Sequence, residues 1–226
     1  GSKNFIFMDQ AGTVSAVAKG PNTLCRLLGD AKFKKDIRFA TDCRAYVFED
    51  AQGRPVAAVW SHIPDVDRGL EQGPVAKMDF AGQQPEFIDL MENQVVPSTD
   101  AKGLSEIPVT PFPLFIRGKA GSLDALCNTI ANSTMQGLKG FPLSVGMGLT
   151  SRTSASLLFV NRISKAFEGE AQVGGTKLAL SLLQTATKSF SVALPEAVPF
   201  DRIAKVSLPL KVSEKGSEGI EKDFSM

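Results

Sequence analysis

Residues 44–60 of the chain read RAYVFEDAQGRPVAAVW. The runs 43–49 and 56–60 are rich in the β-branched and aromatic residues that favour strands. Between them, residues 50–55 include Gly53 and Pro55, which are typical of turns. Two β-rich runs joined by a turn that contains glycine predict an antiparallel β-hairpin.

Further strands are predicted along the first half of the chain. The segment 36–39 leads into the hairpin, and other short β-rich segments follow it at intervals of about ten residues. Gly, Pro and Asn separate them, as in a β-sandwich. These later segments are 75–80, 86–90, 95–96, 107–110 and 113–117.

The second half of the chain resumes the strand pattern. Its predicted strands are 141–149, 155–161, 169–173, 189–194 and 203–212. The apolar content of 177–183 does not distinguish a strand from a helix. The tail from Ser213 is charged, and we expect it to fray. The pattern predicts a second sandwich.

A change in composition separates the two halves. Residues 119–140 are small, polar and poor in β-branched pairs, and 122–130 fits either a short helix or an ordered linker. We therefore predict a first domain at 1–120, a linker at 121–140 and a second domain at 141–226.

Helical spacing occurs once, near the beginning. Apolar residues partly repeat at helical intervals over 13–29, but Gly20-Pro21 interrupts the pattern. The better prediction is a helix over 21–28 that ends at Gly29. The predicted fold class is all-β: two tandem antiparallel β-sandwich domains with one short N-terminal helix.

Composition excludes several classes of function. Lys and Arg number 25 against 24 Asp and Glu, so the net charge of +1 indicates no nucleic-acid groove. No apolar run approaches the roughly 20 residues of a membrane-spanning helix. The single histidine and three widely spaced cysteines predict no metal site, and we expect no cofactor.

Four segments resemble a β-rich accessory region that follows the catalytic barrel in several families of bacterial glycoside hydrolases. Residues 44–60 resemble its first hairpin, and 87–93, FIDLMEN, a later Asp-Leu-Met-Gly-Asn-like turn. Residues 107–118, IPVTPFPLFIRG, resemble its closing strand, and 22–29 the helix that bridges barrel and sandwich. One departure is Glu92, where the family turn usually has Gly, so we expect a turn of different construction.

The second half carries a vaguer resemblance. Residues 157–162, LLFVNR, and 192–200 resemble the immunoglobulin-like sandwich domains that are often appended to such enzymes. The resemblance implies a non-enzymatic region that docks against the catalytic domain of the same polypeptide. It also implies secretion, to the periplasm or the cell surface of a bacterium.

The chain's own acidic residues suggest no active site. A glycosidase needs two carboxyl groups about 5–10 Å apart. Glu86 and Asp89 would point to opposite faces of a strand, and Glu168 and Glu170 are expected to be hydrated at a turn. His62 could activate a nucleophile only with an orienting acid such as Asp65 or Asp67. We expect no catalytic residues.

Sugar binding remains as an alternative. A polysaccharide-binding sandwich presents aromatic rings beside polar groups. Of the 17 aromatic residues 15 are Phe, so the candidate carbohydrate-binding residues are Trp60, His62 and Tyr46, all in or beside the hairpin. Three hypotheses stay open: a supporting region, a carbohydrate-binding module with a polysaccharide ligand, and a surface adhesion or interaction module.

Overall fold

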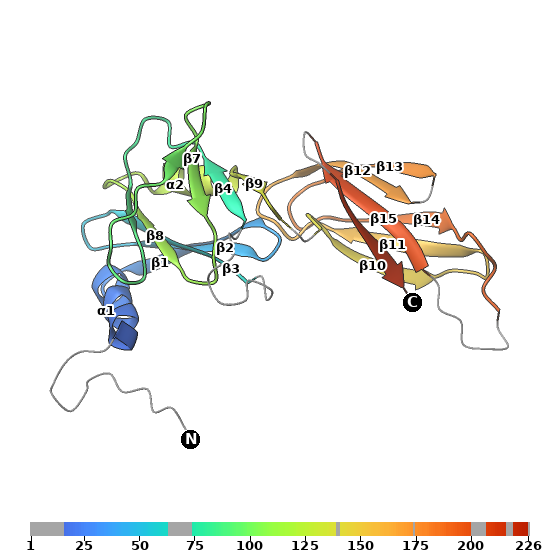
Figure 1. Cartoon of the computed structure of the whole chain (residues 1–226), viewed down its shortest axis with the longest axis horizontal. Helices are drawn as coiled ribbons and strands as arrows, with labels where there is room; N and C mark the ends of the chain where they lie inside the picture. Colours follow the sequence, from blue (N-terminus) through green and yellow to red (C-terminus); the bar gives the residue numbers. More distant parts are fainter. Residues whose placement is uncertain are drawn as a thin grey trace, which may run out of the picture. The chain divides into compact units, whose positions relative to one another are not determined.

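The computed structural model describes residues 16–62, 74–138, 141–173, 175–199, 207–215 and 219–225. The chain divides into two compact units, Gly1–Gly137 and Leu138–Met226 (Figure 1). The described ranges contain two helices and sixteen strands. The strands form four sheets in which every pair of neighbouring strands is antiparallel. The predicted all-β class is confirmed.

The first unit contains a five-stranded and a four-stranded sheet. In the five-stranded sheet the order is β1 (Lys32–Ala40), β2 (Cys43–Glu49), β3 (Pro55–Ser61), β8 (Leu114–Arg117) and β5 (Glu86–Ile88). In the four-stranded sheet the order is β6 (Ser98–Thr99), β7 (Ser105–Pro108), β4 (Val75–Met78) and β9 (Thr134–Gln136). The hairpin predicted from residues 44–60 is β2–β3, with Glu49 opposite Pro55.

Helix α2 (Leu123–Ala131) packs against β1, β2 and β3. Its buried residues, Leu126, Cys127 and Ile130, recur at the spacing of one helix face. The expected linker at 121–140 therefore needs correction. Up to Gly137 this segment belongs to the first unit, because α2 buries an apolar face and β9 pairs with β4.

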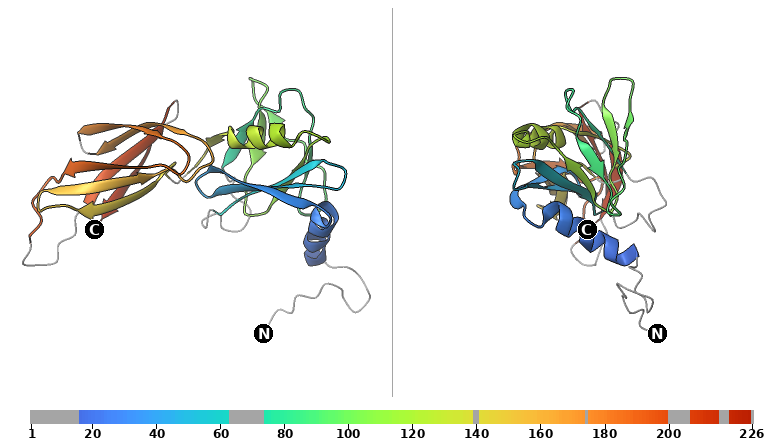
Figure 2. Two further views of the ribbon diagram at one scale, coloured as in Figure 1. Left: turned by 180° about the vertical axis from the view of Figure 1, so that it is seen from behind. Right: turned by 90° about the vertical axis from the view of Figure 1, so that its left-hand side faces the viewer.

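Helix α1 (Ala16–Leu28) lies on the other side of the five-stranded sheet from α2 (Figure 2). Leu27 is buried against Val56 and Ala58 of β3. The predicted helix over 21–28 is too short, since α1 continues through Pro21 to Ala16; residues 13–15 of the pattern lie outside the described residues.

Tertiary contacts hold α1 together across this proline. Gly20 lies so close to Leu90 that a Cβ there would be 3.3 Å from the leucine Cγ. The Thr23 hydroxyl lies 2.9 Å from the carbonyl oxygens of Lys19 and Leu90 and can donate to either. Docking on the turn after β5 thus outweighs the local tendency of Gly20-Pro21 to end a helix.

Three turns of the first unit share one construction. An aspartate opens each, its Oδ1 accepts from the backbone N–H groups two and four residues later, and the fourth residue has a positive φ. The aspartates are Asp50, Asp89 and Asp100, and the fourth residues are Gly53 (φ 72°), Glu92 (φ 66°) and Gly103 (φ 83°). The expectation of a different construction at Glu92 is therefore wrong.

The second unit is a sandwich of a three-stranded and a four-stranded sheet. In the three-stranded sheet the order is β10 (Ser144–Leu149), β11 (Ser154–Val160) and β14 (Thr187–Ala193). In the four-stranded sheet the order is β13 (Thr176–Leu182), β12 (Phe167–Val173), β15 (Ser207–Glu214) and β16 (Ile220–Ser225). One buried cluster draws on both sheets, including Leu157 and Phe159 from one and Phe167 and Leu210 from the other.

Two predictions for this unit change. The ambiguous segment 177–183 forms strand β13 up to Leu182. The tail was expected to fray, but where the structure describes its last residues, β16 pairs with β15 from Ile220 to Ser225. The first residues of the predicted strand 203–212 lie outside the described ranges.

Asn161, in the LLFVNR segment, fixes the end of β11. It is fully buried, and its amide nitrogen lies within hydrogen-bond distance of the carbonyl oxygens of Lys165, Leu182 and Leu183. Its Oδ1 accepts from the N–H of Ile163. A buried amide with partners on several segments holds the loop after β11 to the end of β13.

The burial of the cysteines predicts their reactivity. Burial raises the pKa of Cys43 to about 12 and also raises that of Cys127, whereas Cys25 is exposed on α1. Because the thiolate is the nucleophile, a maleimide at pH 8 should label one thiol quickly in the native protein. Cys25→Ser should abolish this fast labelling, as counted by intact mass. Fast labelling of two thiols in folded protein would contradict the structure.

Candidate functional site

Tyr46, Trp60 and His62, the residues selected from the sequence, lie side by side. Tyr46 is diagonal to Trp60 in the β2–β3 register, and their ring centroids are 4.7 Å apart. The rings of Trp60 and His62 are 5.8 Å apart, and the indole N–H donates to His62 Nε2 at 3.0 Å. The hairpin therefore brings together residues that are up to 16 positions apart in sequence.

Two further aromatic residues extend this group along the sheet. Phe33 of β1 lies 5.9 Å from the ring of Tyr46 and 5.7 Å from that of Phe48. Phe33 is 57% exposed, whereas Tyr46, Phe48 and Trp60 are half-buried. We refer to Phe33, Phe48, Tyr46, Trp60 and His62 as the aromatic row.

The strand alternation explains why this row faces outward. Ala45 and Val47, the neighbours of Tyr46, are fully buried. Successive side chains of a strand point to opposite faces, so Tyr46 and Phe48 lie on the other face of the sheet. Sequence reasoning missed Phe33 because it stands among lysines in a strand and is one of 15 phenylalanines.

Charged groups border the aromatic row. Arg44 Nη1 donates to the Tyr46 hydroxyl at 3.3 Å. In the β1–β2 register, Asp36 lies opposite Tyr46, and Arg38 lies opposite Arg44. Arg38 Nε and Asp36 Oδ2 approach to 4.0 Å. The face therefore combines apolar rings with hydrogen-bond donors and one carboxylate.

The angles between rings limit what the aromatic row can bind. Every ring pair in it is edge-to-face, with interplanar angles between 73° and 85°. Such pairs stabilise one another, but successive rings do not share a plane. The row therefore offers single ring faces and edges to a ligand rather than one flat platform.

The Trp60 side chain contacts both the apolar cluster beneath α1 and the exposed rings of the aromatic row. It is half-buried and packs against the apolar cluster that includes Leu27, Ala58 and Phe115. Its ring also contacts Tyr46 and His62. Trp60 thus marks the boundary between the part of the outer sheet face that α1 covers and the part that it leaves open.

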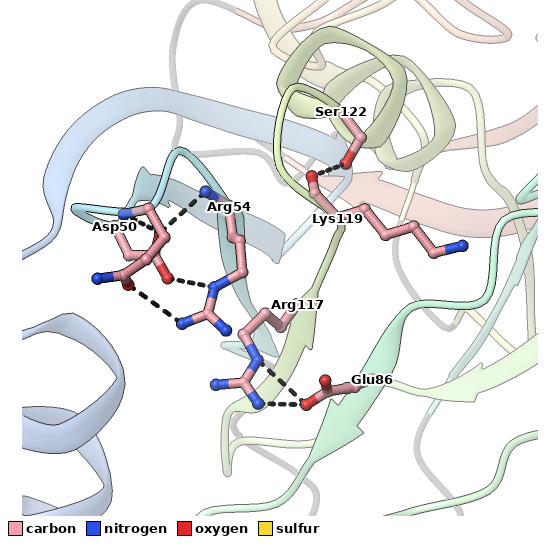
Figure 3. Close-up of polar contacts among 7 residues, drawn as sticks. Asp50, Arg54, Glu86, Arg117, Lys119 and Ser122 are labelled. Carbon is pink, nitrogen blue, oxygen red and sulfur yellow. Dashed lines mark hydrogen bonds and ion pairs between the residues drawn. The ribbon is translucent and has the colours of Figure 1, made fainter.

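The acidic residues near the hairpin are held by basic partners (Figure 3). Glu86 forms an ion pair with Arg117, whose Nε lies 3.1 Å from Glu86 Oε2. Arg54 Nε donates to Asp50 Oδ2 at 2.7 Å. Burial acts to raise the pKa of Asp50, but hydrogen bonds from Arg54 and Gln52 outweigh it and hold that pKa below its ordinary value.

The other acidic residues considered from the sequence also have partners. Asp89 accepts two backbone hydrogen bonds inside its turn. In the second unit, Ser181 donates to Glu168 at 2.6 Å, and Lys177 lies 3.6 Å from Glu170. In these positions the carboxylates stabilise turns and strands.

The remaining sequence candidates are placed only in part. Asp65 and Asp67, considered as partners of His62, lie outside the described residues. Across the part of the chain that the structure describes, no three His, Cys, Asp or Glu side chains gather as a metal site. No helix in that same part has the length and apolar character needed to cross a membrane.

Comparison with known proteins finds weak structural likeness. No family model and no curated protein sequence matches the chain. Among solved structures, the chain is similar to a GH2 β-galacturonidase from Eisenbergiella tayi bound to glycerol, with a TM-score of 0.26 and 12% identity. The match covers 87% of this chain and 44% of the enzyme chain, so this chain spans less than half of that protein.

The contact between Trp60 and His62 predicts a change in fluorescence when the histidine is replaced. The His62 imidazole accepts from the indole N–H at 3.0 Å, and the two ring centroids are 5.8 Å apart. His62→Ala removes both contacts, so the emission of the single tryptophan should change while the circular dichroism of the fold is retained. An emission spectrum identical to that of the wild type would contradict the contact.

Proposed function

We propose that the chain is a non-catalytic β-sandwich region of a larger carbohydrate-active protein, and that it supports a glycoside hydrolase domain in another part of that protein. The observation that carries the proposal is the assembly of the four resembling segments. They supply the C-terminal part of α1, the β2–β3 hairpin, the end of β5 with the turn after it, and the end of β7 with β8. Three of the four segments contribute neighbouring strands, in the order β2-β3-β8-β5, to the five-stranded sheet. The fourth segment belongs to α1, which packs on that sheet.

This assembly matters because the segments are distant in sequence. Residues 22–29 and 107–118 come together only through the fold, where Leu27 and Phe115 share one cluster. A family-specific packing unit requires such contacts, whereas isolated chance matches do not. The pairing of the acidic residues described above agrees with a supporting role.

The outer side of α1 offers a surface for docking. Leu27 and Thr23 are buried against the sheet, but Leu24 is 40% exposed and Cys25 is exposed. The helix is therefore covered on one side only. In the proposed role, the exposed side of α1 would contact the catalytic domain. By the same resemblance, we propose a secreted, periplasmic or cell-surface location.

The proposal is tested with the parental protein in two pieces. We expect the present chain to hydrolyse none of a panel of aryl glycosides, because Glu86, Asp89, Glu168 and Glu170, the acids considered as candidates, each hold a structural partner. Added to the separately produced catalytic piece, it should raise that piece's melting temperature by about 2–4 °C for each kcal/mol of association.

A pair of variants makes this test specific. Leu24→Ser should weaken the stabilisation, whereas Val96→Ser, at a 92% exposed position on another segment, should leave it unchanged. Hydrolysis by the chain alone, or a catalytic piece indifferent to its addition, would refute the proposal.

A second function, binding of a polysaccharide, is favoured by the aromatic row. The exposed Phe33 ring, together with His62 and Arg44, provides the ring face and polar groups that sugar binding uses. Because successive rings are perpendicular, we expect contact with one or two sugar units rather than a long chain.

Affinity gel electrophoresis distinguishes this function from the first. If the aromatic row binds sugar, at least one soluble polysaccharide should retard the protein. Phe33→Ala and His62→Ala should then weaken the retardation, and Val96→Ala should not. Trp60 is unsuitable for this test since its substitution would also disturb the cluster beneath α1. Unchanged mobility across the panel would exclude sugar binding under those conditions.

A further inference from the structure

Glu92 has a left-handed backbone conformation at a turn position where the two similar turns have glycine, Gly53 and Gly103. The turns opened by Asp50, Asp89 and Asp100 have the same hydrogen bonds, and their fourth residues have φ values of 72°, 66° and 83°. Residues with a Cβ disfavour this left-handed region by about 5- to 30-fold in equilibrium. Glycine would avoid that strain at position 92 as it does at Gly53 and Gly103.

The Glu92 side chain reaches α1. Its Oε1 accepts from Arg26 Nε at 3.0 Å and lies 3.4 Å from Asn22 Nδ2. The side chains of Arg26 and Glu92 are 54% and 31% exposed, and an ion pair this accessible contributes at most about fivefold to an equilibrium. The contact therefore offsets only part of the backbone strain.

The same turn holds α1 at a second point. The Thr23 hydroxyl can donate to the Leu90 carbonyl oxygen, and Gly20 packs against the Leu90 side chain. Residues 90 and 92 of one turn thus contact α1 from Gly20 to Arg26. A side chain at position 92 adds the polar contact that glycine could not make.

We infer that Glu92 is a latch: a strained turn residue whose carboxylate fixes the position of α1 on the five-stranded sheet. Its role is to position the helix, and overall stability would be served better by glycine. This inference concerns the attachment of α1 within the first unit and holds independently of the proposed function.

Hydrogen exchange of α1, read beside global unfolding, tests the latch. Glu92→Gly should increase amide exchange in residues 16–28 by about two- to fivefold, the size of the lost contact. The same variant should lower the unfolding constant of the first unit, followed by Trp60 fluorescence, by about two- to tenfold, because strain is relieved. Loosening of the helix and strengthening of the fold are thus expected together.

Two further variants separate the contact from the strain. Arg26→Gln removes the ion pair but keeps the strain, so it should loosen α1 without stabilising the unit. Gly53→Glu adds strain without a latch, since a Cβ at Gly53 meets no atom within 4 Å. This variant should raise the unfolding constant by about 5- to 30-fold. The α1 amide exchange that occurs through local opening, without unfolding of the whole unit, should stay unchanged.

Salt provides an independent readout. An exposed ion pair is screened at high ionic strength, so α1 exchange in the wild type should quicken between low and 1 M salt. Glu92→Gly and Arg26→Gln should show little of this dependence. Unchanged α1 exchange in Glu92→Gly, or a less stable first unit in that variant, would overturn the inference.

Discussion

Strand β3 is the element on which the first unit depends, because it is buried on both faces. Ala57 and Val59 point to one side and are at most 1% exposed, while Val56 and Ala58 point to the other and lie under α1. A strand covered on both faces needs apolar residues at successive positions, which is why 56–60 reads VAAVW. The small alanines at 57 and 58 leave room for neighbouring elements to pack closely.

The elements around β3 differ in how far the sequence predicts them. The hairpin was predictable because strong β-formers flank an Asp-x-x-Gly turn. Helix α2 could be predicted only as one of two alternatives, a short helix or an ordered linker over 122–130. Its nine residues include Asp124, Asn128 and Thr129, and only its tertiary contacts with β1 to β3 decide in favour of the helix. Strand β16 was missed for a similar reason: charged residues are acceptable on an edge strand that pairs with β15.

The candidate site was predictable in part. Tyr46, Trp60 and His62 were selected because each is the single residue of its type, and the hairpin register places them together. Phe33 could not be selected, since a bulge between Phe33 and Lys35 sets its facing, and no local sequence signal marks that bulge. At Glu92 the sequence revealed the departure from glycine, but not that the backbone keeps the conformation of glycine.

Trp60 connects the two halves of the outer sheet face. On one side it packs in the cluster that holds Leu27 of α1, and on the other it contacts Tyr46 and His62 of the aromatic row. Glu92, in the turn after β5, contacts the same helix at Asn22 and Arg26. A shift of α1 would therefore change the packing of Trp60, and through its indole N–H it would change the hydrogen bond to His62. The attachment of the helix and the exposed rings therefore share one packed residue, Trp60.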